Sequence, residues 1–189
     1  MKFLRKTKAS LILQKGWRYA AHARQIRLEL MREQGGFCAY TEKYLEEIDS
    51  VDVEHFDHRL KNDEADSYWN WYAVLHFINQ KKRNDIEKHE PILTPYDEST
   101  LQRIVYRHGQ FQPTNQGDRE ANNLINFLRL NDAQLAAHRN QWIARQKATL
   151  QRFFQGNKKD FIEFLKSVPG GLSYATALEA ELDITIDLP

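Results

Sequence analysis

The sequence predicts an α+β protein that is mainly helical, with a small core of strands in its middle. Long segments near both ends carry apolar residues at helical spacing, whereas the segment VDVEHF at 51–56 alternates in the manner of a half-buried strand. The chain has 189 residues, of which 41% are hydrophobic and 28% are charged. It is therefore long enough for one domain with a real core, or for a small domain with a helical appendage.

The first third of the chain predicts a helix followed by a hairpin. Residues 16–34 are rich in Ala, Arg and Leu, and Gly35 and Gly36 end this helix. Residues 37–40 read as a short strand, and the 51–56 strand follows after a turn-like stretch. We expect these two strands to pair with each other.

The middle of the chain predicts a loop, a helix and a second hairpin. Residues 57–67 are polar and irregular, and residues 68–85 begin aromatic and end basic, which indicates a turn that enters a helix. Residues 89–99 contain two prolines and are typical of a loop. Residues 101–106 and 110–112 flank the sequence RHG and form the expected second hairpin.

The last third of the chain predicts helices. Helical patterns cover residues 119–129, 132–154 and 159–168, with Asp132 at a capping position. The sequence PGG at 169–171 then separates a last helix-like segment and an acidic tail. We divide the chain into a basic N-terminal arm and helix (1–34), a core (35–90), and a hairpin with a C-terminal helical region (91–189).

Composition excludes several classes of protein. The single cysteine, Cys38, rules out a disulfide framework and any Cys₄ or Cys₂His₂ zinc site within one chain. No apolar run approaches 18 residues, and the N-terminal LILQ is too short for a signal-peptide core, so we expect a cytoplasmic protein that does not enter a membrane. The formal net charge is only +1, but residues 1–33 contain nine Lys and Arg residues and only two acidic residues. This arm is compatible with a phosphate backbone or with a solvated helix face.

The centre of the chain contains the side chains that phosphodiester hydrolysis requires. His55 ends a strand and is a base that is neutral near pH 7. Glu54 and Asn79 offer hard oxygen ligands for Mg²⁺ or Mn²⁺. Lys82 follows Asn79 by three residues, so both lie on one helix face.

These segments resemble the HNH endonucleases, whose ββα-metal fold is a hairpin followed by a helix that binds one divalent ion. The matching residues are Cys38 to Tyr40, the acid–base pair Glu54-His55, the middle asparagine Asn70, and Asn79 with Lys82. The resemblance implies that His55 is the general base and that Glu54 and Asn79 hold one Mg²⁺ or Mn²⁺ ion. It also implies that Asn70 holds the loop and orients His55.

A further resemblance covers most of residues 20–150. Segments 93–97, 109–113, 130–131 and 135–139 are similar to the HNH subunit of Septu-type and retron-associated bacterial anti-phage systems. This likeness implies an effector nuclease for antiviral defence that cuts DNA, with RNA as an alternative substrate, and a co-encoded ATPase as its partner.

The chain departs from the family pattern at the zinc knuckle. The four positions of the family's zinc knuckle are Cys38, Thr41, Leu75 and Ile78, so we expect no structural zinc.

We expect the nucleic-acid backbone to be held by Arg59, Lys81, Lys82 and Arg83. The alternative function is a non-catalytic subunit that uses the same scaffold to bind nucleic acid or to dock on an ATPase.

Overall fold

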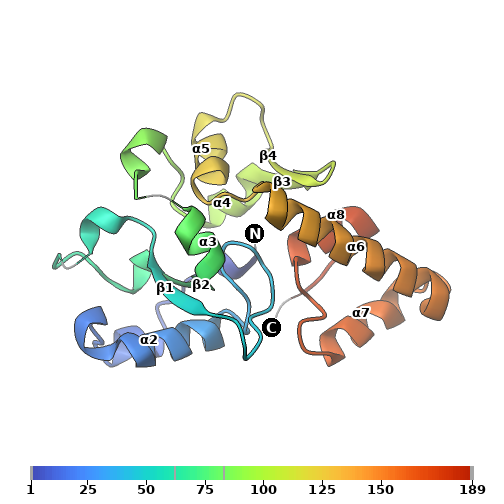
Figure 1. Ribbon diagram of the computed structural model, residues 1–189, viewed down its shortest axis with the longest axis horizontal. Helices are drawn as coiled ribbons and strands as arrows, with labels where there is room; N and C mark the ends of the chain where they lie inside the picture. Colours follow the sequence, from blue (N-terminus) through green and yellow to red (C-terminus); the bar gives the residue numbers. More distant parts are fainter. Residues whose placement is uncertain (1, 62, 83, 188–189) are drawn as a thin grey trace.

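The computed structural model describes residues 2–61, 63–82 and 84–187, and Figure 1 shows their arrangement. The helices are α1 (Leu11–Gln14), α2 (Tyr19–Glu33), α3 (His76–Lys81), α4 (Glu98–Arg103), α5 (Arg119–Phe127), α6 (Ala133–Phe154), α7 (Lys158–Ser167) and α8 (Ala175–Leu182). The strands are β1 (Val51–His55), β2 (Trp71–Leu75), β3 (Ile104–Arg107) and β4 (Gln110–Pro113). The protein is thus a mixed, mainly helical structure with two small antiparallel sheets, β1–β2 and β3–β4.

The partner of β1 differs from the expected one. β1 pairs with β2, in a register that sets Val51 opposite Leu75 and His55 opposite Trp71. The expected partner, residues 37–40, is a loop that makes a single bridge between Phe37 and Tyr44 and lies beside β2. The expected helix after residue 68 therefore begins only at His76, because the preceding segment WYAVL is a strand.

The two faces of the β1–β2 hairpin are covered by different helices. Trp71 and Ala73 pack with α2 in one apolar cluster, whereas Tyr72 and Val74 belong to the larger core, on the side of α3. Figure 1 shows α2 and α3 on opposite sides of the strands. Because neighbouring strand residues point to opposite faces, adjacent side chains of β1 lie in different surroundings.

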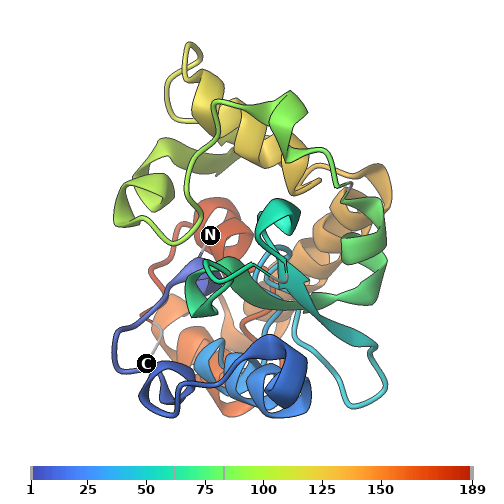
Figure 2. The same cartoon turned by 90° about the vertical axis from the view of Figure 1, so that its left-hand side faces the viewer.

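The remaining elements follow the sequence predictions closely. The second hairpin forms, although its first strand begins at Ile104 because residues 98–103 are the short helix α4. The helices expected at 119–129, 132–154 and 159–168 are α5, α6 and α7. Each is capped at its N-terminus by a side chain that accepts a backbone N–H, namely Asp118, Asp132 and Asn157. Figure 2 shows the β3–β4 hairpin and α5 together on one side of the β1–β2–α3 unit.

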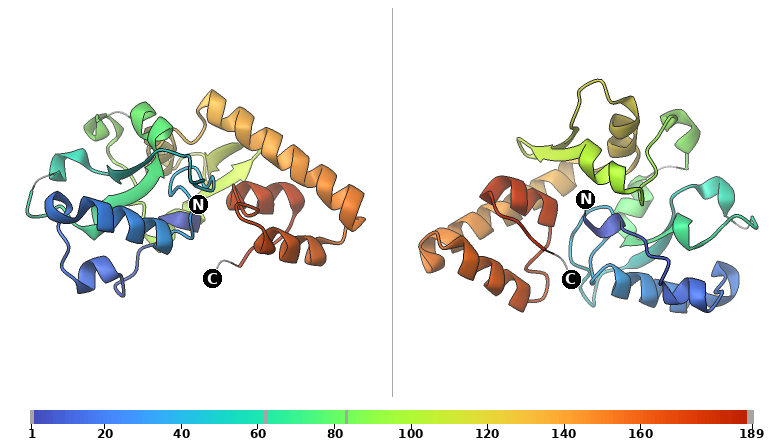
Figure 3. Two further views of the ribbon diagram at one scale, coloured as in Figure 1. Left: turned by 60° about the horizontal axis from the view of Figure 1, so that its bottom comes forward. Right: turned by 180° about the vertical axis from the view of Figure 1, so that it is seen from behind.

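The C-terminal helices share the core with the rest of the chain. Figure 3 shows the long helix α6 beside α7 and α8. The larger apolar cluster extends from Leu4 to Ile186 and draws on all three parts of the sequence. Lys2 Nζ donates to Glu179 Oε1 (2.7 Å) and to Ile186 O (2.6 Å), which ties the two ends together. In the described part of the chain, no helix is both long and apolar enough to cross a bilayer.

Candidate active site at the end of strand β1

His55 is the last residue of β1 and lies on the α2 side of the hairpin. Its residue surface is 6% exposed. The ring of Tyr19, in the first turn of α2, meets the imidazole edge to face with 4.6 Å between ring centroids. The pairing of the two strands closes just beyond it, where Phe56 N–H donates to Asn70 O at 2.9 Å.

Asp66 and Asn70 connect His55 to the loop that joins the two strands. Asp66 Oδ2 lies 3.0 Å from His55 Nε2, and both side chains are 6% exposed. This contact is close without being aligned as a hydrogen bond. Asp66 Oδ1 accepts from Trp71 Nε1 (2.7 Å) and from Asn70 Nδ2 (3.0 Å). Asn70 also binds both backbone polar groups of Asp57, at 2.8 and 3.0 Å, and so closes the loop from 57 to 70.

This environment sets the protonation of His55. Burial lowers the pKa of His55, and the negative charge of Asp66 opposes that shift. The imidazole is therefore neutral near pH 7. A proton on Nε2, facing Asp66, leaves the Nδ1 lone pair as the base.

Glu54 lies on the other face of β1, where it pairs with Lys82. Lys82 Nζ contacts Glu54 Oε1, and the two side chains are 1% and 9% exposed. The ammonium group also lies 4.4 Å from the centroid of the Phe127 ring. Burial raises the pKa of Glu54, while the charge of Lys82 opposes the rise. Lys82 is thus an internal ion-pair partner, and the expectation that it contacts nucleic acid at the surface is corrected.

Asn79 on α3 is directed at Asp52 rather than at Glu54. Its Nδ2 donates to Asp52 Oδ2 at 2.8 Å, and His76 Nδ1 lies 2.8 Å from the same oxygen. Asp52 and Glu54 are two residues apart on β1 and therefore share a face. The charge of Asp52 contributes to the raised pKa of Glu54. Asp52 is a candidate ligand that our sequence reasoning missed, although the D-x-E alternation of the strand was visible.

The chemistry of this face fits a hard divalent cation. Two carboxylates and one amide supply oxygen donors of the kind that Mg²⁺ and Mn²⁺ prefer. The hydroxyls of Tyr40 and Tyr72 are buried without a hydrogen-bond partner in the described residues, and the charge of Glu54 adds to burial in raising the pKa of Tyr40. Within residues 2–61, 63–82 and 84–187, no three His, Cys, Asp or Glu side chains converge as a preformed cluster. Asp52, Glu54 and Asn79 are candidate ligands by the chemistry of their oxygen donors.

Two of the other predicted cations, Arg59 and Lys81, hold acidic partners at the surface. Arg59 pairs with Asp57 (2.8 Å) and Glu90 (2.9 Å). Lys81 pairs with Asp132 at 3.1 Å, at the start of α6. Arg83 lies outside the described residues.

The four positions that sequence resemblance aligned with the zinc knuckle of HNH endonucleases are Cys38, Thr41, Leu75 and Ile78. Leu75 N donates to Cys38 Sγ at 3.4 Å, and Cys38 and Ile78 are fully buried in the larger core. Thr41 is 1% exposed. These four side chains offer one thiol, one hydroxyl and two aliphatic groups, so apolar packing holds the loop against β2 and α3.

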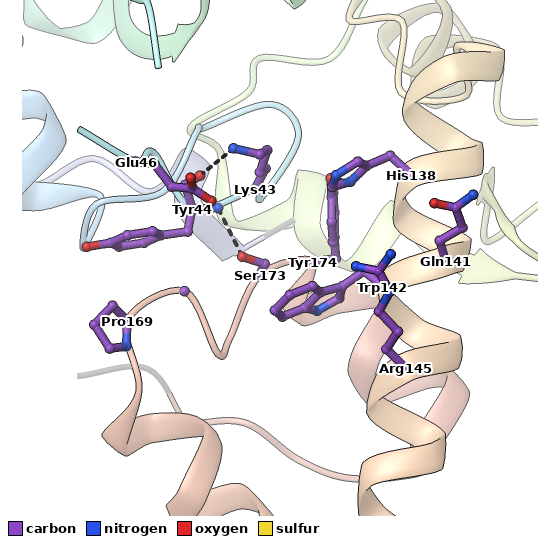
Figure 4. Close-up of a pocket in the computed structure, with 11 residues that line it drawn as sticks. Lys43, Tyr44, Glu46, His138, Gln141, Trp142, Arg145, Pro169, Ser173 and Tyr174 are labelled. Atoms are coloured by element: carbon purple, nitrogen blue, oxygen red, sulfur yellow. Dashed lines mark hydrogen bonds between the residues drawn. The ribbon is translucent and has the colours of Figure 1, made fainter. Parts of the chain in front are cut away.

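Two cavities lie elsewhere in the molecule. One, of about 520 Å³, is bordered by Lys43 and Tyr44, by α6 and by the segment that precedes α8. Figure 4 shows Trp142 and Arg145 extending from α6 toward this space, with Tyr44 and Ser173 across it. The other, of about 880 Å³, lies between the N-terminal segment and the end of α2. Neither is lined by Asp52, Glu54, His55 or Asn79.

Asp66 is the second residue that our sequence reasoning missed. It lies in the polar stretch DEADS, where neither strand nor helix periodicity distinguishes one acid from another. Only the closure of the loop by Asn70 brings it to His55.

Comparison of the chain with models of protein families, with curated proteins and with solved structures gives no match.

Proposed function

We propose that this protein is a metal-dependent endonuclease that hydrolyses DNA, with His55 as the general base. The observation that carries the proposal is the arrangement of His55, Asp66 and Asn70 at the end of β1. A buried, neutral histidine with a carboxylate at one ring nitrogen has the environment of a general base. The strand–strand–helix order β1–β2–α3, with Asp52 and Glu54 on the face of β1 toward α3 and Asn79 on α3, supports the same function.

The proposed reaction is the hydrolysis of a backbone phosphodiester. His55 Nδ1 takes a proton from water as the water oxygen forms a bond to phosphorus, and the bond from phosphorus to the 3′ oxygen breaks in line. Asp66 holds the ring and stabilises the imidazolium that results. A Mg²⁺ or Mn²⁺ ion held by Asp52, Glu54 and Asn79, on the α3 side of β1, would supply positive charge for the phosphate and the leaving oxygen. The phosphate would have to lie at the end of the strand to meet both this ion and His55, which is on the α2 side. By its likeness to anti-phage nucleases, we further propose a role in bacterial defence with a co-encoded ATPase.

A second candidate function is favoured by the burial of the same histidine. His55 is 6% exposed, Tyr19 covers its ring, and Glu54 is already paired with Lys82. These contacts are also what a scaffold without chemistry would have. The alternative is a subunit that binds nucleic acid, or docks on an ATPase, and does not cut.

Plasmid cleavage in Mg²⁺ or Mn²⁺ tests the proposal. We expect His55→Ala to lose about 10²–10⁴-fold in rate, the usual contribution of a general base. His108→Asn, in the β3–β4 turn, is the control and should cleave like the wild type.

The pH dependence of cleavage tests the same residue. As the pH is lowered, the wild-type rate should stay constant through the ordinary pKa range of histidine and fall only at lower pH, because burial lowers the pKa of His55. Asp66→Asn should slow cleavage and move this acid limb to still lower pH, since the Asp66 charge raises that pKa. Undiminished cleavage by His55→Ala would refute the assignment.

Metal binding separates the two candidate functions when no cleavage is seen. A rise in the melting temperature of the wild type with Mn²⁺ that is absent in Asp52→Ala and Asn79→Ala indicates the metal site. If the wild type neither cleaves nor shifts, the scaffold function is supported instead.

A further inference from the structure

The exposed residues between positions 2 and 28 include no acidic side chain. Glu29 is the first acid of the sequence. Five exposed cations lie on α1 and α2 or in the segments next to them. We call them the α1–α2 cations: Lys8, Lys15, Arg18, Arg24 and Arg27. In the part of the chain that the structure describes, none of these five side chains has an ion-pair partner.

This surface contrasts with the cations that the sequence suggested. Lys82 is buried with Glu54, Lys81 pairs with Asp132, and Arg59 pairs with two carboxylates. A phosphate that approached those side chains would have to displace a carboxylate or enter the core. The α1–α2 cations impose no such cost, because their charges face only water.

The same surface leads to the candidate active site. Arg18 is the N-cap of α2 and precedes Tyr19, whose ring contacts His55. Arg24 and Arg27 are three residues apart and therefore lie on one face of the helix. α2 packs on the face of the β1–β2 hairpin toward which His55 points.

We propose that the α1–α2 cations are the binding track for the backbone of duplex DNA and lead it to His55. This inference rests on the proposed function for its substrate, but it concerns binding and does not require cleavage. Contacts of this kind carry charge without sequence specificity, so the track fixes affinity and position rather than a recognition site.

An anionic membrane is a poorer occupant for this surface. Insertion requires a continuous apolar face beside the basic one. The large apolar side chains exposed on α1 and α2 are only Leu13 and Leu28 among the described residues, at 37% and 55%. The rest of the α2 surface is made of alanine, arginine and glutamine.

Fluorescence anisotropy with a labelled DNA duplex tests the track. EDTA in the buffer keeps the duplex intact. We expect Arg24→Glu/Arg27→Glu to weaken binding at least about tenfold near 50 mM salt, and to lower the slope of log K against log salt by about two. The control is Arg152→Glu/Lys159→Glu, two exposed positions on α6 and α7, on the other side of the molecule from α2. It changes the net charge equally and should bind within about threefold of wild type, because charges beyond a Debye length of about 14 Å at this salt concentration are screened.

The outcomes separate the track from the nuclease. Loss of binding in the α2 variant alone supports the track, even if the wild type does not cut. Equal binding by both double variants overturns the track, even if the wild type cuts in Mg²⁺. A wild type that does not bind the duplex, or that prefers anionic phosphatidylserine vesicles in the same buffer, also overturns it. Circular dichroism of each variant verifies that α2 remains folded.

Discussion

Glu54 and Lys82 form a buried ion pair between positions 28 residues apart in the chain. Sequence reasoning identified both residues but assigned them to different tasks, one to a metal and one to a phosphate. Charge and spacing identify a residue as acidic or basic, but not whether it faces water. Burial excludes the phosphate contact expected for Lys82, because a lysine side chain that is 1% exposed cannot reach a ligand at the surface.

The pair predicts a large difference between two neighbouring lysines. Lys82→Met leaves Glu54 buried without its partner, and breaking a buried pair in this way costs about 3–5 kcal/mol. Lys81→Met removes a surface pair with Asp132 and should cost no more than about 1 kcal/mol. Urea unfolding of the two variants measures both. The double variant Glu54→Gln/Lys82→Met should recover part of the loss, because no buried charge is left alone. Equal losses for the two single variants would contradict the buried pair.

The candidate base could be found from the sequence, but its partner could not. His55 follows an acid at the end of an alternating strand, which is a local pattern. Asp66 reaches it through hydrogen bonds that Asn70 makes across the loop. Such contacts depend on how the loop closes, and the composition of a polar loop does not encode which acid turns inward.

At the scale of elements, the longer C-terminal helices were predictable, whereas the short capped helices α1 and α4 and the pairing of β1 with β2 were missed. Asp118, Asp132 and Asn157 each cap the helix that the sequence placed after them. Strand β2 was missed because WYAVL is apolar on both faces and shows no alternation. A short apolar run fits a buried strand and a helix start equally well. The observed pairing buries both faces of the run, against α2 on one side and the larger core on the other.

The cap of α6 gives a prediction for an element. Asp132 accepts hydrogen bonds from the backbone N–H groups of Gln134 (3.1 Å) and Leu135 (3.3 Å) and also pairs with Lys81. Asp132→Ala should lower the free energy of unfolding by about 1 kcal/mol through loss of the cap. Asp132→Asn keeps a capping oxygen and loses only the surface pair, so it should cost a few tenths of a kcal/mol. Chemical denaturation ranks the two, and equal losses for Asn and Ala would show that the ion pair, which both variants lose, matters more than the cap.

At the scale of the whole molecule, the N-terminal segment is built into the fold rather than appended to it. Leu4 is fully buried in the larger core, and Lys2 binds Glu179 and Ile186 near the C-terminus. Lys6 Nζ contacts Trp71 O on β2 and lies over the rings of Tyr68 and Tyr72, 4.3 and 4.2 Å from their centroids. The sequence indicated a basic arm here, and only the packing shows that Lys6 belongs to the interior.

Lys6 makes the stability of the protein depend on pH. Burial lowers the pKa of Lys6 from 10.5 to about 7, and the charge of Glu33 opposes the shift. Between these two values the unfolded chain binds the proton more tightly than the folded protein does. The free energy of unfolding should therefore rise as pH increases from about 7 to about 9, by at most about 1.4 kcal/mol per pH unit from this group. Lys6→Met should remove this rise, whereas Lys8→Met, at an exposed position without an ion-pair partner, should keep it. Urea unfolding of the three proteins across this pH range measures the slopes. Parallel curves for wild type and Lys6→Met would mean that Lys6 stays solvated and that the N-terminal segment does not seal the core beneath Tyr68 and Tyr72.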